Sequence, residues 1–182
     1  MAADPRPTPI AGVYELQSQY FIDSRGSFLN LFRAQDKSFS YVWNQQVSQV
    51  NLSRTEALGS IRGLHLQAHP HTEAKLVRCL KGKVWDVAVD LRPESSSYGQ
   101  WTSVLLTPEL ANAFVIPPGC GHGFQTLEDG SELLYLHSGR WVPSSETGVR
   151  WDDPHLAITW PLPSSEISDR DRALPTFSQY SS

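Results

Sequence analysis

Residues 75–91 read KLVRCLKGKVWDVAVDL, and this stretch decides the fold class. Side-chain character alternates along residues 75–80, where Lys75, Val77 and Cys79 share one face. It alternates again along residues 84–91, where one face carries Trp85, Val87, Val89 and Leu91. A period of two is that of a β-strand. A glycine between two lysines connects the runs, so the stretch predicts two strands joined by a tight turn.

Similar short runs recur about every ten residues on either side of this stretch. They cover residues 20–22, 27–32, 47–52, 101–106, 114–116, 122–127 and 132–137. The connections carry Gly and Pro, and helix-like stretches are confined to residues 36–39, 108–112 and 164–173. Many short strands with such turns indicate an all-β antiparallel sandwich or jelly roll with a few short helices.

Composition limits the classes of protein. The chain has 182 residues and a formal net charge of −4, with no basic run, which argues against nucleic-acid binding. Apolar runs are far shorter than the roughly 20 residues of a membrane span, and residues 1–7 lack the apolar core of a secretory signal. Cys79 and Cys120 are the only cysteines, and we expect two buried thiols in a cytoplasmic protein. We expect one domain over residues 1–182, with an N-terminal arm at 1–12 and a loose tail at 176–182.

Several polar residues interrupt strands that are otherwise suited to a core. They are Arg62, His65, Lys75, His122 and Tyr135. Inward faces of neighbouring strands converge on one cavity in a barrel, so these residues together would form an acid–base site. Taken singly, each is more often a structural residue.

A metal centre is the competing interpretation. His69-Pro70-His71 is followed by Glu73, and His122 closes a P-x-G-x-x-H segment, as in metal-dependent cupins. A lysine at position 75 opposes this hypothesis, because its charge would repel a cation.

Eight motifs in a fixed order resemble the dTDP-4-dehydrorhamnose 3,5-epimerase family, over about residues 10–175. They are DSRG at 23–26, SIRGLHLQ at 60–67, KLVR at 75–78, GKVWDVAVDLR at 82–92, YGQW at 98–101, IPPGCGHGF at 116–124, VRWDDP at 149–154 and SDRDR at 168–172. The resemblance implies a cupin-type jelly roll, a homodimer without metal or cofactor, and inversion of C3 and C5 in a 4-keto-6-deoxy sugar on a nucleoside diphosphate, as in dTDP-rhamnose biosynthesis.

The resemblance also implies roles for particular residues. His65 matches the base and Asp171 the carboxylate that orients it, while Lys75 lies near the C4 oxygen and Tyr135 is the acid on the opposite ring face. The expected substrate contacts are Arg25 and Arg62 to the diphosphate, His122 in the same pocket, Gln49 and Asn51 to the nucleotide, and Trp141 stacking on the base. The chemistry agrees, because a C4 ketone acidifies the protons on C3 and C5 and imidazole titrates near neutral pH.

Some positions depart from the family pattern. Asn30 stands where a glutamate is common in the substrate site, and Leu52 where a histidine is common. The nucleotide therefore stays open between dTDP, CDP and GDP, and a mono-epimerase remains an alternative. The spacing before Asp171 is about one residue short, which makes Asp169 a rival orienting carboxylate. A metal-binding cupin and a non-catalytic sugar-binding module are the alternatives from other classes.

Overall fold

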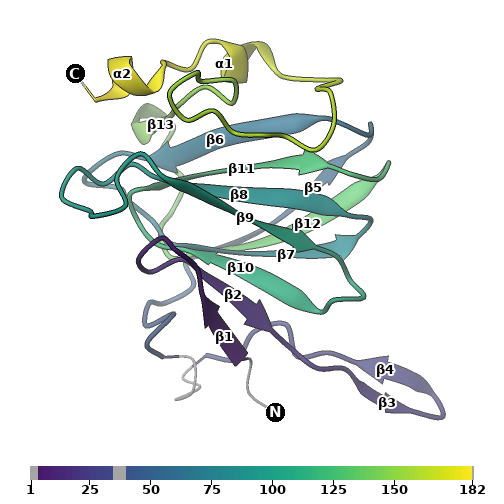
Figure 1. The fold of residues 1–182 in the computed structure, drawn as a ribbon. Helices are drawn as coiled ribbons and strands as arrows, with labels where there is room; N and C mark the ends of the chain where they lie inside the picture. The colour runs from purple at the N-terminus through teal and green to yellow at the C-terminus, as the bar shows by residue number, and fades with distance from the viewer. Residues whose placement is uncertain (1–3, 35–39, 182) are drawn as a thin grey trace.

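Two antiparallel sheets stack face to face in the computed structural model, which describes residues 4–34 and 40–181 (Figure 1). The first sheet has the order β1-β2-β10-β7-β12-β5. Its strands are β1 (Asp4–Pro7), β2 (Tyr14–Gln17), β10 (Asn112–Ile116), β7 (Lys75–Lys81), β12 (Ser131–His137) and β5 (Gln49–Thr55). The second sheet has the order β13-β6-β11-β8-β9. Its strands are β13 (Glu146–Gly148), β6 (Ile61–Gln67), β11 (Cys120–Thr126), β8 (Val84–Asp90) and β9 (Trp101–Leu106).

Hydrophobic residues fill the space between the sheets. Alternate residues of β7 and β10, among them Val77, Cys79 and Phe114, pack there against Ala88 of β8 and Phe124 of β11. Burial of such apolar area contributes about 25 cal/mol per Å² to folding. The all-β sandwich predicted from the alternation is confirmed.

The outer faces of both sheets are also covered. Leu76 on β7 packs with Trp43 from the segment before β5. Trp85 on β8 contacts Trp101 and Trp160, with ring centroids 5.8 and 5.4 Å apart. Trp85 is therefore partly buried on the outer face of the second sheet, which the C-terminal segment covers.

The helices are shorter than the sequence indicated. The α-helices of the described residues are α1 (Asp169–Arg172) and α2 (Phe177–Tyr180), and η1 (Pro143–Ser145) is a 3₁₀ turn. Residues 108–111 form a turn in which the Ala111 N–H donates to the Pro108 carbonyl, and β10 begins at the next residue. The helix predicted at 108–112 is therefore wrong. The helix predicted at 164–173 shrinks to α1, and the one at 36–39 lies outside the described residues.

The predicted loose tail is wrong over Phe177–Tyr180. The Thr176 side chain caps α2, and Phe177 is buried, since its ring packs beside Tyr98. Within the described part of the chain, no helix is long and apolar enough to cross a membrane.

A separate hairpin of β3 (Phe21–Asp23) and β4 (Gly26–Phe28) projects beyond the stacked sheets (Figure 1). Phe21, Ile22 and Phe28 expose 47%, 80% and 63% of their surface there. Burial of apolar side chains stabilises a fold, so this extension makes little contribution to the core of its own chain.

Candidate active site

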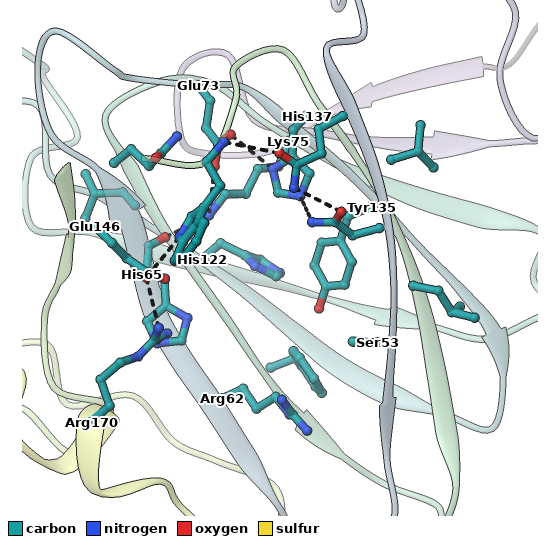
Figure 2. A pocket seen from close by; sticks show the side chains of 18 residues that line it. Ser53, Arg62, His65, Glu73, Lys75, His122, Tyr135, His137, Glu146 and Arg170 are labelled. Carbon is teal, nitrogen blue, oxygen red and sulfur yellow. Dashed lines mark hydrogen bonds and ion pairs between the residues drawn. The ribbon is translucent and has the colours of Figure 1, made fainter. Parts of the chain in front are cut away.

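A pocket opens between the two sheets and is lined mainly by polar side chains (Figure 2). Its walls come from β5, β7 and β12 of the first sheet and from β6, β11 and β13 of the second. Of the residues predicted for the site, Gln49, Asn51, Arg62, His65, Lys75, His122, Tyr135 and Trp141 line this pocket. Asp171 lies behind His65.

An irregularity in β6 places Arg62 and His65 in the same pocket. In a regular strand, residues three apart point to opposite faces. Here Arg62 pairs with Phe124 and His65 with His122, so β6 has one more residue than β11 between these pairs. Such a β-bulge redirects side chains. Gly63 sits in the bulge with φ +131°, where a Cβ would lie 2.5 Å from Gly123 Cα.

His65 is oriented by Asp171. The Asp171 Oδ1 atom lies 2.7 Å from His65 Nε2, and Oδ2 accepts the Gly63 N–H at 3.1 Å. Burial disfavours the charged carboxylate, but the hydrogen bond and charge of His65 outweigh it, and the pKa of Asp171 lies below its ordinary value. Asp171 Oδ1 is nearer to Nε2 than Arg170 Nη2 is, at 2.7 against 3.2 Å, and an ionised carboxylate only accepts, so Nε2 presents a proton to Asp171. In the neutral imidazole the lone pair is then on Nδ1. The side chain of Asp169, the rival carboxylate, is fully exposed and pairs with Arg172.

Lys75 is a buried cation on the opposite wall. Its ammonium donates to the His65 carbonyl at 3.1 Å and lies 3.9 Å from Glu73 Oε1. Burial lowers the pKa of Lys75, and the charges of Glu73, Glu146 and Asp86 oppose that shift. A partly desolvated ammonium at this position is suited to an anionic oxygen.

Tyr135 faces His65 across the pocket, because β12 and β6 belong to different sheets. Its ring lies edge-on to His122 at 5.9 Å and stacks on His137 at 5.9 Å (Figure 2). Burial raises the pKa of the Tyr135 phenol, and the nearby Asp86 charge raises it further. The phenol therefore keeps its proton at neutral pH and can act as an acid.

His122 forms a second imidazole–carboxylate pair. Its Nε2 lies 2.7 Å from Asp86 Oδ1, and both side chains are buried. Burial raises the pKa of Asp86 and lowers that of His122, while their mutual attraction opposes both shifts.

The other end of the pocket carries neutral polar groups and an exposed indole. The Gln49 amino group donates to Asn51 Oδ1 at 3.0 Å, and the backbone N–H of Trp141 donates to Gln49 Oε1 at 3.2 Å. Trp141 is 55% exposed and its indole N–H donates to Glu146 at 3.1 Å. Arg62 reaches the same pocket, held by a bond from Nε to the Thr55 hydroxyl at 3.0 Å.

Arg25 and Asn30 do not line this pocket of their own chain. Arg25 lies at the tip of the β3–β4 hairpin, with its side chain 87% exposed and paired with Asp23 at 2.6 Å. Asn30 follows β4, next to Leu31, whose carbonyl accepts from buried Arg78 at 2.8 Å. Both miss the pocket because the hairpin points away from the sandwich.

The residues of the metal hypothesis do not assemble. His69 and His71 are exposed, Glu73 pairs with His137, and His122 pairs with Asp86. Among the residues with described positions, no three His, Cys, Asp or Glu side chains form a group that could hold a metal ion.

Comparison with known proteins shows which family has this arrangement. Residues 7–179 match the family model described as dTDP-4-dehydrorhamnose 3,5-epimerase. The enzyme of that name from Escherichia coli K12 is 39% identical over 175 residues, covering 94% of this chain and 93% of its own. The chain belongs to the dTDP-4-dehydrorhamnose 3,5-epimerase family.

Two further relatives of the epimerase family bear on the chemistry. A dTDP-4-dehydrorhamnose 3-epimerase from Streptomyces niveus is 38% identical over 167 residues, covering 92% of this chain and 80% of its own. A Legionella pneumophila 3,5-epimerase, solved in complex with dTDP-4-keto-L-rhamnose, superimposes with a TM-score of 0.90 at 34% identity, covering 97% of this chain and 94% of that one.

The epimerase pocket contains residues that the sequence did not single out for this role. They are Ser53, Glu73, His137, Glu146 and Arg170, with Asp86 behind His122. Arg170 pairs with Glu146 at 2.9 Å and with Asp171 at 3.6 Å. His137 could have been found, because it lies two residues after Tyr135 on one strand and so shares its face. Arg170 lies in the SDRDR motif, which assigned it no role, and nothing local in the sequence marks Glu146.

Proposed function

We propose that this protein inverts C3 and C5 of a dTDP-4-keto-6-deoxyhexose by removing a proton from one ring face and returning one to the other. The observation that supports this proposal most directly is that the His65–Asp171 pair and the Tyr135 side chain lie on opposite walls of one pocket. Inversion at carbon requires an acid and a base on opposite faces, so this placement fits epimerisation better than hydrolysis or simple binding.

The proposed proton path begins at His65. Its Nδ1 lone pair takes the proton from C5 or C3, and the C–H electron pair moves through the C–C bond onto the C4 oxygen as an enolate. Lys75 stabilises this negative charge; one such donor is worth roughly 3–4 kcal/mol. Tyr135 then gives its hydroxyl proton to the opposite face of the same carbon, the enolate returns to the ketone, and solvent restores both protonation states.

The nucleotide end of the pocket supports a nucleoside diphosphate substrate. The Arg62 guanidinium can bind phosphate oxygens bidentately. The exposed indole of Trp141 offers a surface on which a base can stack, beside the amides of Gln49 and Asn51. The names of the relatives favour dTDP.

We further propose that the protein is a cytoplasmic homodimer in which Arg25 reaches the pocket of the partner. The hairpin carries exposed apolar side chains and a cation away from its own pocket. In a two-fold dimer each copy gives and receives the same segment. Cys79 and Cys120 are free and buried, as suits a reducing compartment.

The decisive experiment follows hydrogen exchange in deuterated water with dTDP-4-keto-6-deoxyglucose, read by NMR of substrate and product. Deuterium at both C3 and C5, with inversion of both centres, is expected. The Streptomyces niveus relative makes inversion at C3 alone the specific alternative. Parallel reactions with CDP- and GDP-linked substrates test the nucleotide. No exchange with any 4-keto nucleotide sugar would refute an epimerase.

A further inference from the structure

Three hydrogen bonds and one ion pair connect the two ends of the pocket along one wall. The Trp141 N–H donates to Gln49 Oε1 at 3.2 Å, and Gln49 Nε2 donates to Asn51 Oδ1 at 3.0 Å. Asn51 Nδ2 lies 3.4 Å from His137 Nε2, and His137 Nδ1 lies 3.1 Å from Glu73 Oε2. Figure 2 shows Glu73, Lys75 and His137 close together on one side of the pocket.

The direction of each hydrogen bond in this chain is fixed from its Trp141 end, because a backbone N–H can only donate. Gln49 must therefore present its oxygen to Trp141 and its amino group to Asn51. Asn51 in turn presents its amino group to His137.

The same reasoning fixes the state of His137. Its Nε2 must accept from Asn51, so the ring proton is on Nδ1, which lies 3.1 Å from Glu73 Oε2. His137 is therefore neutral in this arrangement. A proton on Nε2 would point at the Asn51 amino group, which is also a donor. If the Asn51 amide turned to present its oxygen instead, its amino group would face the Gln49 amino group. If Gln49 then turned as well, its amino group would face the Trp141 backbone N–H, so one pair of donors would always remain in contact.

Glu73 links this chain to the reacting end of the pocket. Its side chain is 6% exposed, and its second carboxylate oxygen, Oε1, lies 3.9 Å from the Lys75 ammonium. The charged or titratable neighbours of His137 are Glu73 and Lys75 from the first sheet's inner wall, Tyr135 on its own strand, and Glu146 across the pocket on β13.

We propose that His137, held by Glu73, is a positioning residue that fixes the orientation of the Asn51 and Gln49 amides toward the nucleotide. This inference rests on the proposed function for the identity of the ligand. Asn51 is exposed to the pocket, and each amide keeps one N–H and one oxygen lone pair outside the chain. Fixing the amides presents those groups to the ligand in one arrangement.

Two variants of His137 separate this role from packing. His137→Phe keeps a ring against Tyr135 but can neither accept from Asn51 nor donate to Glu73. His137→Asn keeps one donor and one acceptor. The matched control is His155→Phe, which replaces an imidazole that stacks on Phe177 at 4.7 Å, away from the pocket.

The measurements are calorimetric titration with dTDP and steady-state kinetics on each full-length variant. His137→Phe is expected to weaken dTDP binding about tenfold, equivalent to about 1.4 kcal/mol. KM should rise in parallel and kcat should change less. His137→Asn should recover most of the affinity, and His155→Phe should bind as the wild type does. Equal binding by wild type and His137→Phe would overturn the inference.

A second readout does not depend on the ligand. The ¹⁵N chemical shifts of the His137 ring in the unliganded protein at neutral pH should report a protonated Nδ1 and a bare Nε2. An Nε2–H tautomer or an imidazolium would overturn the inference, whatever the substrate is. If the wild type does not bind dTDP but His137 has the expected tautomer, the proposed nucleotide fails and the hydrogen-bonded chain stands.

Discussion

Asp171 and His65 are separated by 106 positions in the chain, yet the Asp171 carboxylate lies 2.7 Å from the His65 imidazole. The Ser168 hydroxyl, which caps α1, accepts the Asp171 N–H at 3.1 Å and helps to hold that residue. The pair is thus built from the start of a short C-terminal helix and the bulged strand β6.

Replacing Asp171 by Asn should lower kcat about 10²–10⁴-fold, because the amide no longer enforces the Nε2–H tautomer of His65. Steady-state kinetics check this. Asp169→Asn is the control on the same helix, where the carboxylate is exposed, and it should retain activity. Equal losses in both variants would contradict the assignment of Asp171 as the orienting carboxylate.

Lys75→Met should reduce kcat about 10²–10³-fold, because it removes the cation beside the developing enolate. A methionine of similar length fits the buried position without an uncompensated charge. Lys81→Met, at the exposed end of the same strand, is the control. Burial lowers the pKa of Lys75, so wild-type kcat should fall on the alkaline side at a lower pH than a free lysine would give. A Lys75→Met protein with unchanged kcat would remove this role.

Tyr135→Phe should separate exchange from inversion. The phenylalanine keeps the ring contacts with His122 and His137 but cannot donate a proton. We expect His65 still to exchange substrate hydrogen with deuterated water, while epimerised product falls by about 10²-fold or more. Tyr98→Phe, in the cluster on the outer face of the second sheet, is the control. Undiminished epimerisation would assign the acid to another group.

Mixing two inactive variants tests the proposed exchange of Arg25 between protomers. Arg25→Ala lacks the hairpin cation and His65→Asn lacks the base. If Arg25 serves the partner's pocket, subunit exchange creates one complete site in each mixed dimer, and activity should return to about a quarter of the wild-type value. Each variant incubated alone is the control. No recovery in mixtures shown by mass spectrometry to contain mixed dimers would refute the exchange.

Short-range pattern locates most strands of the two sheets, but it misses β1, β2 and β13. Residues 101–106 were predicted with the observed bounds, and 75–80 and 84–91 within one residue of β7 and β8. The alternation of two faces is a local property of an extended chain, so sequence carries it directly. Phe177–Tyr180 was misjudged because the burial of Phe177 against Tyr98 depends on a contact across the fold.

The ordered motifs also identified most of the pocket, although they could not place Arg25. A turn sequence such as DSRG specifies a hairpin but not the direction in which that hairpin leaves the sheet. From the sequence, Glu73 and His137 are polar residues next to and on predicted strands. Their pairing depends on the tertiary structure, because β7 and β12 must lie side by side to bring the two side chains together.

By itself, the sequence determined the all-β class, the family and the set of groups available for proton transfer. Those depend on residue type and local spacing. Tertiary structure decided which carboxylate orients His65, which imidazole Glu73 holds, and that Arg25 points away from its own pocket. Each of those outcomes depends on contacts between segments far apart in the chain, where a bulge or a turn of one residue changes the direction of a side chain.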